Sequence, residues 1–147
     1  MRTSATHILL ADDDTDDCLF FKDALEELAL SVTLTTVRDG VELMRHLSTQ
    51  VLPDVIFLDL NMPRKNGYEC LTEIKLNAKL ATIPVVVYST SFEPEVVDLL
   101  FEKGASHYIR KPGDFSRLKA VIHKAILAIQ SAGKERGSRE KFVIQLL

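Results

Sequence analysis

Carboxylates, a hydroxyl and an amine follow short apolar runs at widely separated places in the chain. The segment HILLADDDTDDCLFF passes from apolar residues directly into an acidic cluster that begins with Asp12 and Asp13. Asp59 follows the apolar run DVIFL, and the runs PVVVYS and HYIRK end in Ser89 and Lys111. Carboxylates that share a site raise one another's pKa, and a divalent cation with oxygen ligands removes this conflict. A hydroxyl and an ammonium are suited to phosphate oxygens.

These groups can act together only if the runs that precede them are neighbouring strands. Mg²⁺ is the cation that fits them, because it takes few carboxylates, several waters and a phosphate oxygen. Each residue also has a simpler explanation, since Asp59 can begin a turn and Lys111 can be a surface charge. Their joint placement after four apolar runs nevertheless favours one site that holds a cation and a phosphate.

The apolar pattern predicts strands that alternate strictly with helices. Such alternation indicates an α/β fold with a parallel sheet covered by helices on both faces. Right-handed crossovers then restrict the topology to doubly wound folds, in which the functional crevice lies at the carboxyl ends of the strands. The expected strands are 7–11, 31–37, 54–59, 84–89 and 107–111, and the expected helices are about 16–30, 40–48, 66–78, 94–103 and 114–132.

Composition excludes several other classes of protein. The chain has 147 residues, 46% of them hydrophobic, and a net charge of −3, which does not favour capture of nucleic acid. No apolar run approaches the ~20 residues of a membrane span, and the amino terminus lacks the apolar core of a secretory signal. Cys18 and Cys70 fit no metal or redox spacing, so we expect both to be reduced in a cytoplasmic protein with no membrane partner.

The motifs resemble the receiver domain of two-component response regulators, specifically the single-domain chemotaxis type. They are LLADDD, FLDLNMPRKNG, VVVYSTS and GASHYIRKP, and the resemblance covers about residues 6–130. The strongest match is DLNMP followed by Gly67. The resemblance implies a flavodoxin-like (βα)5 sandwich with parallel strands in the order 2-1-3-4-5.

The resemblance also implies a role for each residue at a matching position. Asp59 would be the phosphoacceptor. Asp13 would bind Mg²⁺ (or Mn²⁺) directly, Asp12 would hold a metal-bound water, and the backbone carbonyl of Asn61 would complete the protein ligands together with Asp59.

Further roles follow from the same resemblance. Ser89 and Lys111 would contact phosphoryl oxygens, and Tyr108 would form a switch with Ser89 by turning inward as Ser89 moves. Asn61 and Ser91 stand at positions that tune hydrolysis, and because neither is acidic we expect a long-lived phosphoryl group.

Three local expectations can be compared directly with coordinates. Gly67 should occupy a turn with positive φ, which glycine adopts without strain. The resemblance implies a cis Lys111–Pro112 bond. His107 should point outward, because it alternates with Tyr108 along its strand.

The expected partners are proteins. The phosphoryl donor would be a sensor histidine kinase or a histidine phosphotransfer protein, and the chain would catalyse only its own phosphorylation and slow autodephosphorylation. About fifteen residues follow the last predicted helix, too few for a DNA-binding domain. Output should therefore pass to an unknown target through the fourth and fifth helices and strand 107–111. The spacing and the apolar tail favour, by analogy, the regulators linked to bacterial phytochromes.

The expected organisation is a receiver domain at 1–132 and a tail at 133–147. Glycines and charges mark the start of the tail, and apolar residues end it. Two interpretations are open: a partly disordered end, or a segment that docks on this domain or on a second copy. A homodimer through the fourth and fifth helices is a further hypothesis.

Rival functions use related chemistry. A haloacid dehalogenase-like aspartyl phosphatase would also need Mg²⁺, but its DxDx[TV] motif fails here at Asp16. A calcium loop starting at Asp12 has Asp17 and Asp23 where glycine and glutamate are needed. A non-phosphorylated receiver-like binding module would lack at least one of the residues that this chain retains.

Overall fold

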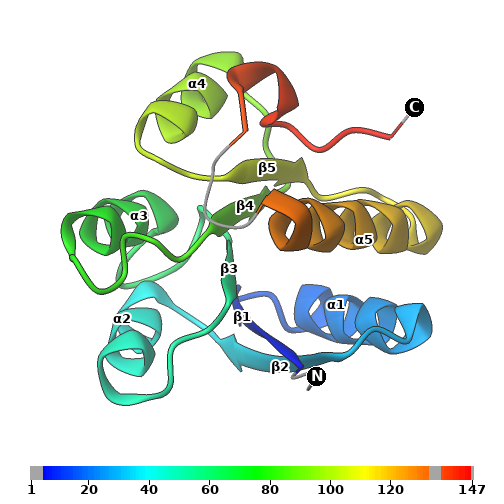
Figure 1. Ribbon diagram of the computed structural model, residues 1–147, viewed down its shortest axis with the longest axis horizontal. Helices are drawn as coiled ribbons and strands as arrows, with labels where there is room; N and C mark the ends of the chain where they lie inside the picture. The colour runs from blue at the N-terminus through cyan, green and yellow to red at the C-terminus, as the bar shows by residue number, and fades with distance from the viewer. Residues whose placement is uncertain (1–4, 133–136, 147) are drawn as a thin grey trace.

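A parallel sheet of five strands forms the centre of the protein (Figure 1). The computed structural model describes residues 5–132 and 137–146. The strand order is β2-β1-β3-β4-β5, which confirms the predicted doubly wound α/β topology. The strands are β1 (Thr6–Ala11), β2 (Val32–Val37), β3 (Val55–Leu58), β4 (Val85–Ser89) and β5 (His107–Arg110).

Helices cover both faces of this sheet. Figure 1 shows α1 and α5 on one face and α2, α3 and α4 on the other. They correspond to the predicted helices with ends displaced by a few residues. The helices are α1 (Thr15–Leu28), α2 (Gly40–Thr49), α3 (Gly67–Leu76), α4 (Pro94–Glu102) and α5 (Phe115–Ala132), and a short 3₁₀ helix, η1 (Arg139–Lys141), follows.

The core consists of two apolar layers, one on each side of the sheet. Alternate residues of a strand point to opposite faces, so Ile8 and Leu10 pack beneath α1 and α5 while Leu9 and Ala11 pack beneath α2 and α3. β3 and β4 are buried along their whole length, as parallel strands with two covered faces should be. Tight packing on both faces holds the carboxyl ends of β1, β3 and β4 in place.

Two glycines stand where the backbone requires them, for different reasons. Gly104 follows α4 with φ +103°, the left-handed conformation in which glycine commonly ends a helix. Among the described glycines only Gly104 has positive φ, so the prediction for Gly67 is wrong. Gly67 instead begins α3 so close to the preceding loop that a Cβ atom would lie 2.4 Å from the Asp59 carbonyl oxygen and 2.8 Å from the Leu60 Cα. Close approach, and not turn geometry, therefore demands glycine here.

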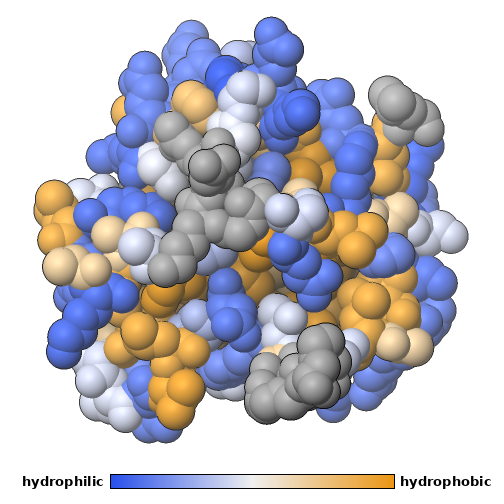
Figure 2. Space-filling model, viewed as in Figure 1, coloured by the Kyte–Doolittle hydropathy of each residue, from blue (hydrophilic) through white to orange (hydrophobic). Residues whose placement is uncertain are grey.

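The surface carries scattered apolar side chains. On the face shown in Figure 2, apolar patches are separated by hydrophilic side chains, as is usual for a folded domain. Within residues 5–132 and 137–146, no helix combines the length and the apolar character that spanning a bilayer requires.

Part of the tail returns to the sheet after α5. Residues 133–136 and 147 of the predicted tail lie outside the described residues, whereas 137–146 pass beside α4 and β5 (Figure 1). Val143 forms an isolated parallel bridge with Tyr108. His107 is only 8% exposed, and its Nδ1 lies 3.3 Å from the Phe142 carbonyl oxygen. The expectation that His107 points outward is wrong, because the tail covers this edge of the sheet.

Candidate functional site

Two central strands place Asp12 and Asp59 side by side. The Asp12 N–H donates to the Val37 carbonyl at 3.0 Å, and the Asp59 N–H donates to the Ala11 carbonyl at 2.9 Å. Both residues are buried, whereas Asp13 is exposed. One carboxylate oxygen each from Asp12, Asp13 and Asp59 lies within 4.8 Å of the others. The three carboxylates therefore meet, as their places after β1 and β3 predicted.

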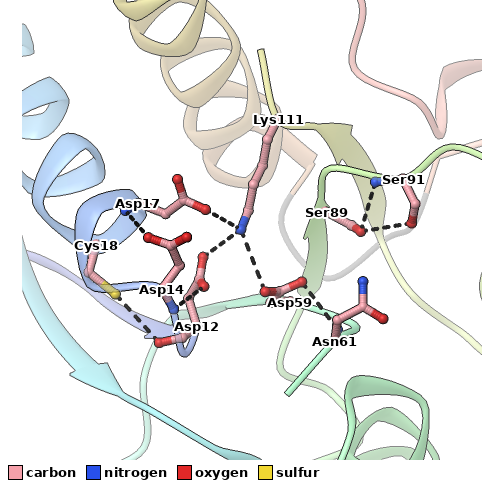
Figure 3. A network of polar contacts seen from close by, with 9 residues as sticks. All are labelled: Asp12, Asp14, Asp17, Cys18, Asp59, Asn61, Ser89, Ser91 and Lys111. Carbon is pink, nitrogen blue, oxygen red and sulfur yellow. Dashed lines mark hydrogen bonds and ion pairs between the residues drawn. The ribbon is translucent and has the colours of Figure 1, made fainter. Parts of the chain in front are cut away.

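Lys111 reaches into this acidic group from the end of β5. Its backbone N–H donates to the Ser89 carbonyl at 2.8 Å, which fixes its position beside β4. Its Nζ lies 2.7 Å from Asp12 Oδ2 and 3.5 Å from Asp59 Oδ2 (Figure 3). The described residues contain no cis peptide bond, so the expected cis Lys111–Pro112 bond is trans instead. The lysine thus reaches the carboxylates from a trans peptide, the form that X–Pro bonds intrinsically favour.

Asp17 is a member of the site that the sequence did not single out. Its Oδ2 lies 2.7 Å from Lys111 Nζ, as close as Asp12 does. Asp14 caps α1 by accepting from the Asp17 N–H at 3.0 Å, and the Asp14 N–H donates to Asp12 Oδ1 at 3.0 Å. Which aspartate of the cluster faces Lys111 depends on where α1 begins. The signal for Asp17 in the sequence is that Asp14 can cap a helix, which places Asp17 in the first turn of that helix.

The charges of the site are unbalanced. Burial raises the pKa of Asp12 to about 6, and burial also raises the pKa of Asp59. Burial by itself lowers the pKa of Lys111, but hydrogen bonds to Asp12 and Asp17 outweigh this effect and raise it. The lysine is therefore firmly charged, while more carboxylates face it than one ammonium can neutralise. Buried oxygen ligands with excess negative charge fit a hard divalent cation.

Hydroxyl groups lie on the other side of Asp59, at the end of β4. Ser89 is fully buried, and its Oγ lies 3.1 Å from Ser91 Oγ and accepts from the Ser91 N–H at 3.2 Å. Figure 3 shows this serine pair beside Asp59, opposite the acidic cluster. The Tyr108 hydroxyl donates to the Ser91 carbonyl, and the fully buried Tyr108 is turned inward. The Asn61 N–H donates to Asp59 Oδ1 at 3.3 Å.

The structure therefore gathers the predicted residues at one end of the sheet, in an acidic group with Lys111 and a neighbouring hydroxyl group. Asp12, Asp13 and Asp59 lie within reach of one another, and Lys111 reaches both Asp12 and Asp59. Tyr108 stands one step further away, since it contacts the serine loop. The cysteines remain outside the chemistry: burial raises the pKa of Cys18 to about 11 and of Cys70 to about 12, so both are protonated thiols.

Comparisons with known proteins agree with this geometry. Residues 8–123 match the family model of the response regulator receiver domain. Response regulator Rcp1 of Synechocystis sp. is 35% identical over 130 residues, which cover 84% of this chain and 86% of that protein. The match favours the receiver prediction over the aspartyl phosphatase.

Solved structures of relatives have the same fold. The phosphorylated cyanobacterial phytochrome response regulator RcpA superposes with a TM-score of 0.79 at 33% identity, covering 92% of this chain and 100% of that one. The Mn²⁺-bound form of Rcp1 superposes with a TM-score of 0.74 at 32% identity, covering 90% and 97%.

Proposed function

The chain belongs to the response regulator receiver family, and we propose that it accepts a phosphoryl group on Asp59 in a reaction that depends on Mg²⁺. Receiver domains of two-component systems take phosphoryl groups from histidine kinases. For this chain, the donor would be the phosphohistidine of a sensor kinase or of a histidine phosphotransfer protein. The observation that carries the proposal is the position of Asp59, buried between the Lys111 amine and the serine pair at the end of β4.

The transfer forms one bond and breaks another. An Asp59 carboxylate oxygen attacks phosphorus, the P–N bond of the phosphohistidine breaks, and the electron pair stays on the imidazole nitrogen. Such reactions depend mainly on positioning and on neutralising charge on the phosphoryl oxygens. Lys111 Nζ, 3.5 Å from Asp59 Oδ2, and the Ser89 hydroxyl are the groups of this chain that can bind those oxygens.

The acidic group supports the metal requirement. Asp12, Asp13, Asp59 and the backbone carbonyl of Asn61 would hold Mg²⁺, or Mn²⁺ as in the Mn²⁺-bound relative Rcp1. A bound divalent cation supplies positive charge that offsets repulsion between the carboxylate and the incoming oxygens.

The phosphorylated state would persist and act through protein contact. Asn61 and Ser91 carry no acidic group that orients an attacking water, which favours slow hydrolysis. The chain would catalyse only its own phosphorylation and slow autodephosphorylation. Ser89 and Tyr108 would transmit the state to α4, β5 and α5, where an unknown target binds. We assign the receiver domain to residues 1–132 and a separate role to the tail, 133–147.

Substitution of the acceptor tests the proposal. Wild-type protein and Asp59→Asn are incubated with acetyl phosphate and Mg²⁺, and phosphate is measured by mass spectrometry and by sensitivity to hydroxylamine. We expect a hydroxylamine-labile phosphate on Asp59 in the wild type and none on Asp59→Asn or in EDTA. Asp16→Asn, an exposed aspartate of the same acidic run as Asp12, is the matched control and should be phosphorylated normally. Equal phosphorylation of Asp59→Asn would contradict the assignment.

A further inference from the structure

The described part of the tail, residues 137–146, forms what we call the tail segment. It is built into the edge of the sheet beside β5. The Tyr108 N–H donates to the Phe142 carbonyl at 2.9 Å, and the Ile144 N–H donates to the Tyr108 carbonyl at 2.9 Å. Phe142 is fully buried and Ile144 is 8% exposed. The backbone N–H and carbonyl of Tyr108 in β5 therefore both bond to the tail segment. The tail segment lies along this edge strand like a short additional strand.

Contacts outside β5 hold the tail segment on both sides. Arg139 Nη2 lies 2.7 Å from Asp98 Oδ1 of α4, and Lys124 Nζ of α5 donates to the Gln145 carbonyl at 2.5 Å. The tail segment thus connects α4, β5 and α5, which together form the proposed output face (Figure 1).

Phe142 packs against the side chain of Tyr108 as well as against its strand. The ring centroids of Tyr108 and Phe142 are 6.4 Å apart, and those of Phe101 and Phe142 are 5.2 Å apart. Phe92 contacts Tyr108 edge to face at 5.7 Å. Because the Tyr108 ring is fully buried among these rings, it cannot turn toward solvent while Phe142 remains docked.

The inward orientation of Tyr108 extends to the reaction centre through hydrogen bonds. The Tyr108 hydroxyl donates to the Ser91 carbonyl, and the N–H and hydroxyl of Ser91 both contact Ser89 Oγ. Figure 3 shows this serine pair near Asp59, on the side away from the acidic cluster. Anything that fixes Tyr108 therefore also restricts the Ser89 hydroxyl.

Building on the proposed function, we propose that Phe142 is a positioning residue: by docking the tail segment it holds Tyr108 inward and keeps Ser89 ready to bind the phosphoryl group. Docking of the tail segment and binding of a phosphoryl group then favour the same arrangement. Thermodynamic linkage requires each event to strengthen the other by the same factor.

The first measurement replaces Phe142 in the full-length chain. Phe142→Ala should weaken the binding of beryllofluoride by at least about 5-fold. Fluorine NMR with Mg²⁺ present measures this binding. Leu146→Ala changes a residue of the tail segment that is 41% exposed, and it should bind like the wild type. Arg139→Ala removes the exposed ion pair with Asp98 and the cation–π contact with the Phe142 ring but leaves that ring in place, so it gives a smaller loss in the same direction should Phe142→Ala unfold.

The second measurement is the reciprocal one, which a merely structural role for Phe142 would not affect. Beryllofluoride should slow hydrogen exchange of the wild-type Ile144 amide by about the factor that Phe142→Ala loses in affinity. The Asp54 amide, bonded to the His7 carbonyl between β1 and β3 at the amino-terminal ends of the strands, should not change.

The outcomes separate this proposal from the proposed function. Wild-type affinity in both Phe142→Ala and Arg139→Ala, or unchanged or faster exchange at Ile144, overturns the role of Phe142 even when Asp59 is phosphorylated. A dimer by sedimentation that Phe142→Ala converts to monomer would place the tail on a second copy and also overturn it. Absence of phosphate on wild-type Asp59 removes both proposals.

Discussion

Replacing Asp12 with asparagine should stabilise the metal-free protein at neutral pH. Burial raises the pKa of this carboxyl from 3.8 to about 6 in the folded protein, even though Lys111 lies 2.7 Å away. A difference of about 2 pKa units corresponds to about 3 kcal/mol, which is the cost of keeping Asp12 charged in the folded state. Asparagine has nearly the same shape, can still accept from the Asp14 N–H, and leaves Lys111 paired with Asp17.

The pH dependence follows from linkage. The folded protein holds the Asp12 proton more tightly than the unfolded chain does, so the protonated carboxyl favours folding. Stability contributed by this group is fully present below pH 3.8, falls as the pH rises and is lost above about pH 6. Asp12→Asn removes this decline, and its advantage over the wild type should reach up to about 3 kcal/mol at pH 7.5.

Urea unfolding followed by circular dichroism measures the effect in EDTA between pH 4 and pH 8. Asp16→Asn is the control, because Asp16 is exposed and lies outside the site. Mg²⁺ should stabilise the wild type more than Asp12→Asn, since a cation that binds the folded state shifts unfolding by mass action. If Asp12→Asn is no more stable than the wild type at pH 7.5 in EDTA, the claim that burial dominates this carboxyl is refuted.

Two further substitutions test the packing around the site and the tail. Gly67→Ala should destabilise the protein by about 1 to 3 kcal/mol and slow phosphorylation, because the new Cβ would lie 2.4 Å from the Asp59 carbonyl oxygen. Gly113→Ala is its control, since no atom lies within 4 Å of that Cβ, and equal stability of the two variants in urea unfolding would contradict the steric explanation. Burial lowers the pKa of His107 from 6.5, so the unfolded chain binds this proton more readily and stability should fall as the pH drops below 6.5. The measurement uses the Asp12→Asn background, in which His107→Gln should flatten this decline whereas the control His123→Gln should not. An unchanged slope of stability against pH in His107→Gln would show that burial of His107 is not the cause.

Two of the corrections, at His107 and at Gly67, share a physical origin. His107 was expected to face outward because alternation along a strand predicts two faces, yet the tail segment covers the edge of that strand. Gly67 was assigned to a turn with positive φ, whereas a helix begins there against the Asp59 backbone. At His107 the neighbour is a segment distant in the chain, and at Gly67 it is the loop that precedes α3; periodicity along one element carries no information about either neighbour.

The alternation of strands and helices, the parallel sheet and the residues that end each strand could all be predicted from the sequence. These follow from local periodicity and from the rule that carboxyl ends of parallel strands meet at one edge. Asp12, Asp59, Ser89 and Lys111 were therefore predictable as neighbours.

The further groups that join these residues depend on how the elements pack in three dimensions. Asp17 faces Lys111 because α1 begins after Asp14. The tail segment lies on β5 because Phe142 packs against Phe101 and Tyr108. Such contacts depend on distances between elements that are far apart in the chain. Those distances are fixed when the two apolar layers pack, and no local pattern of residues encodes them.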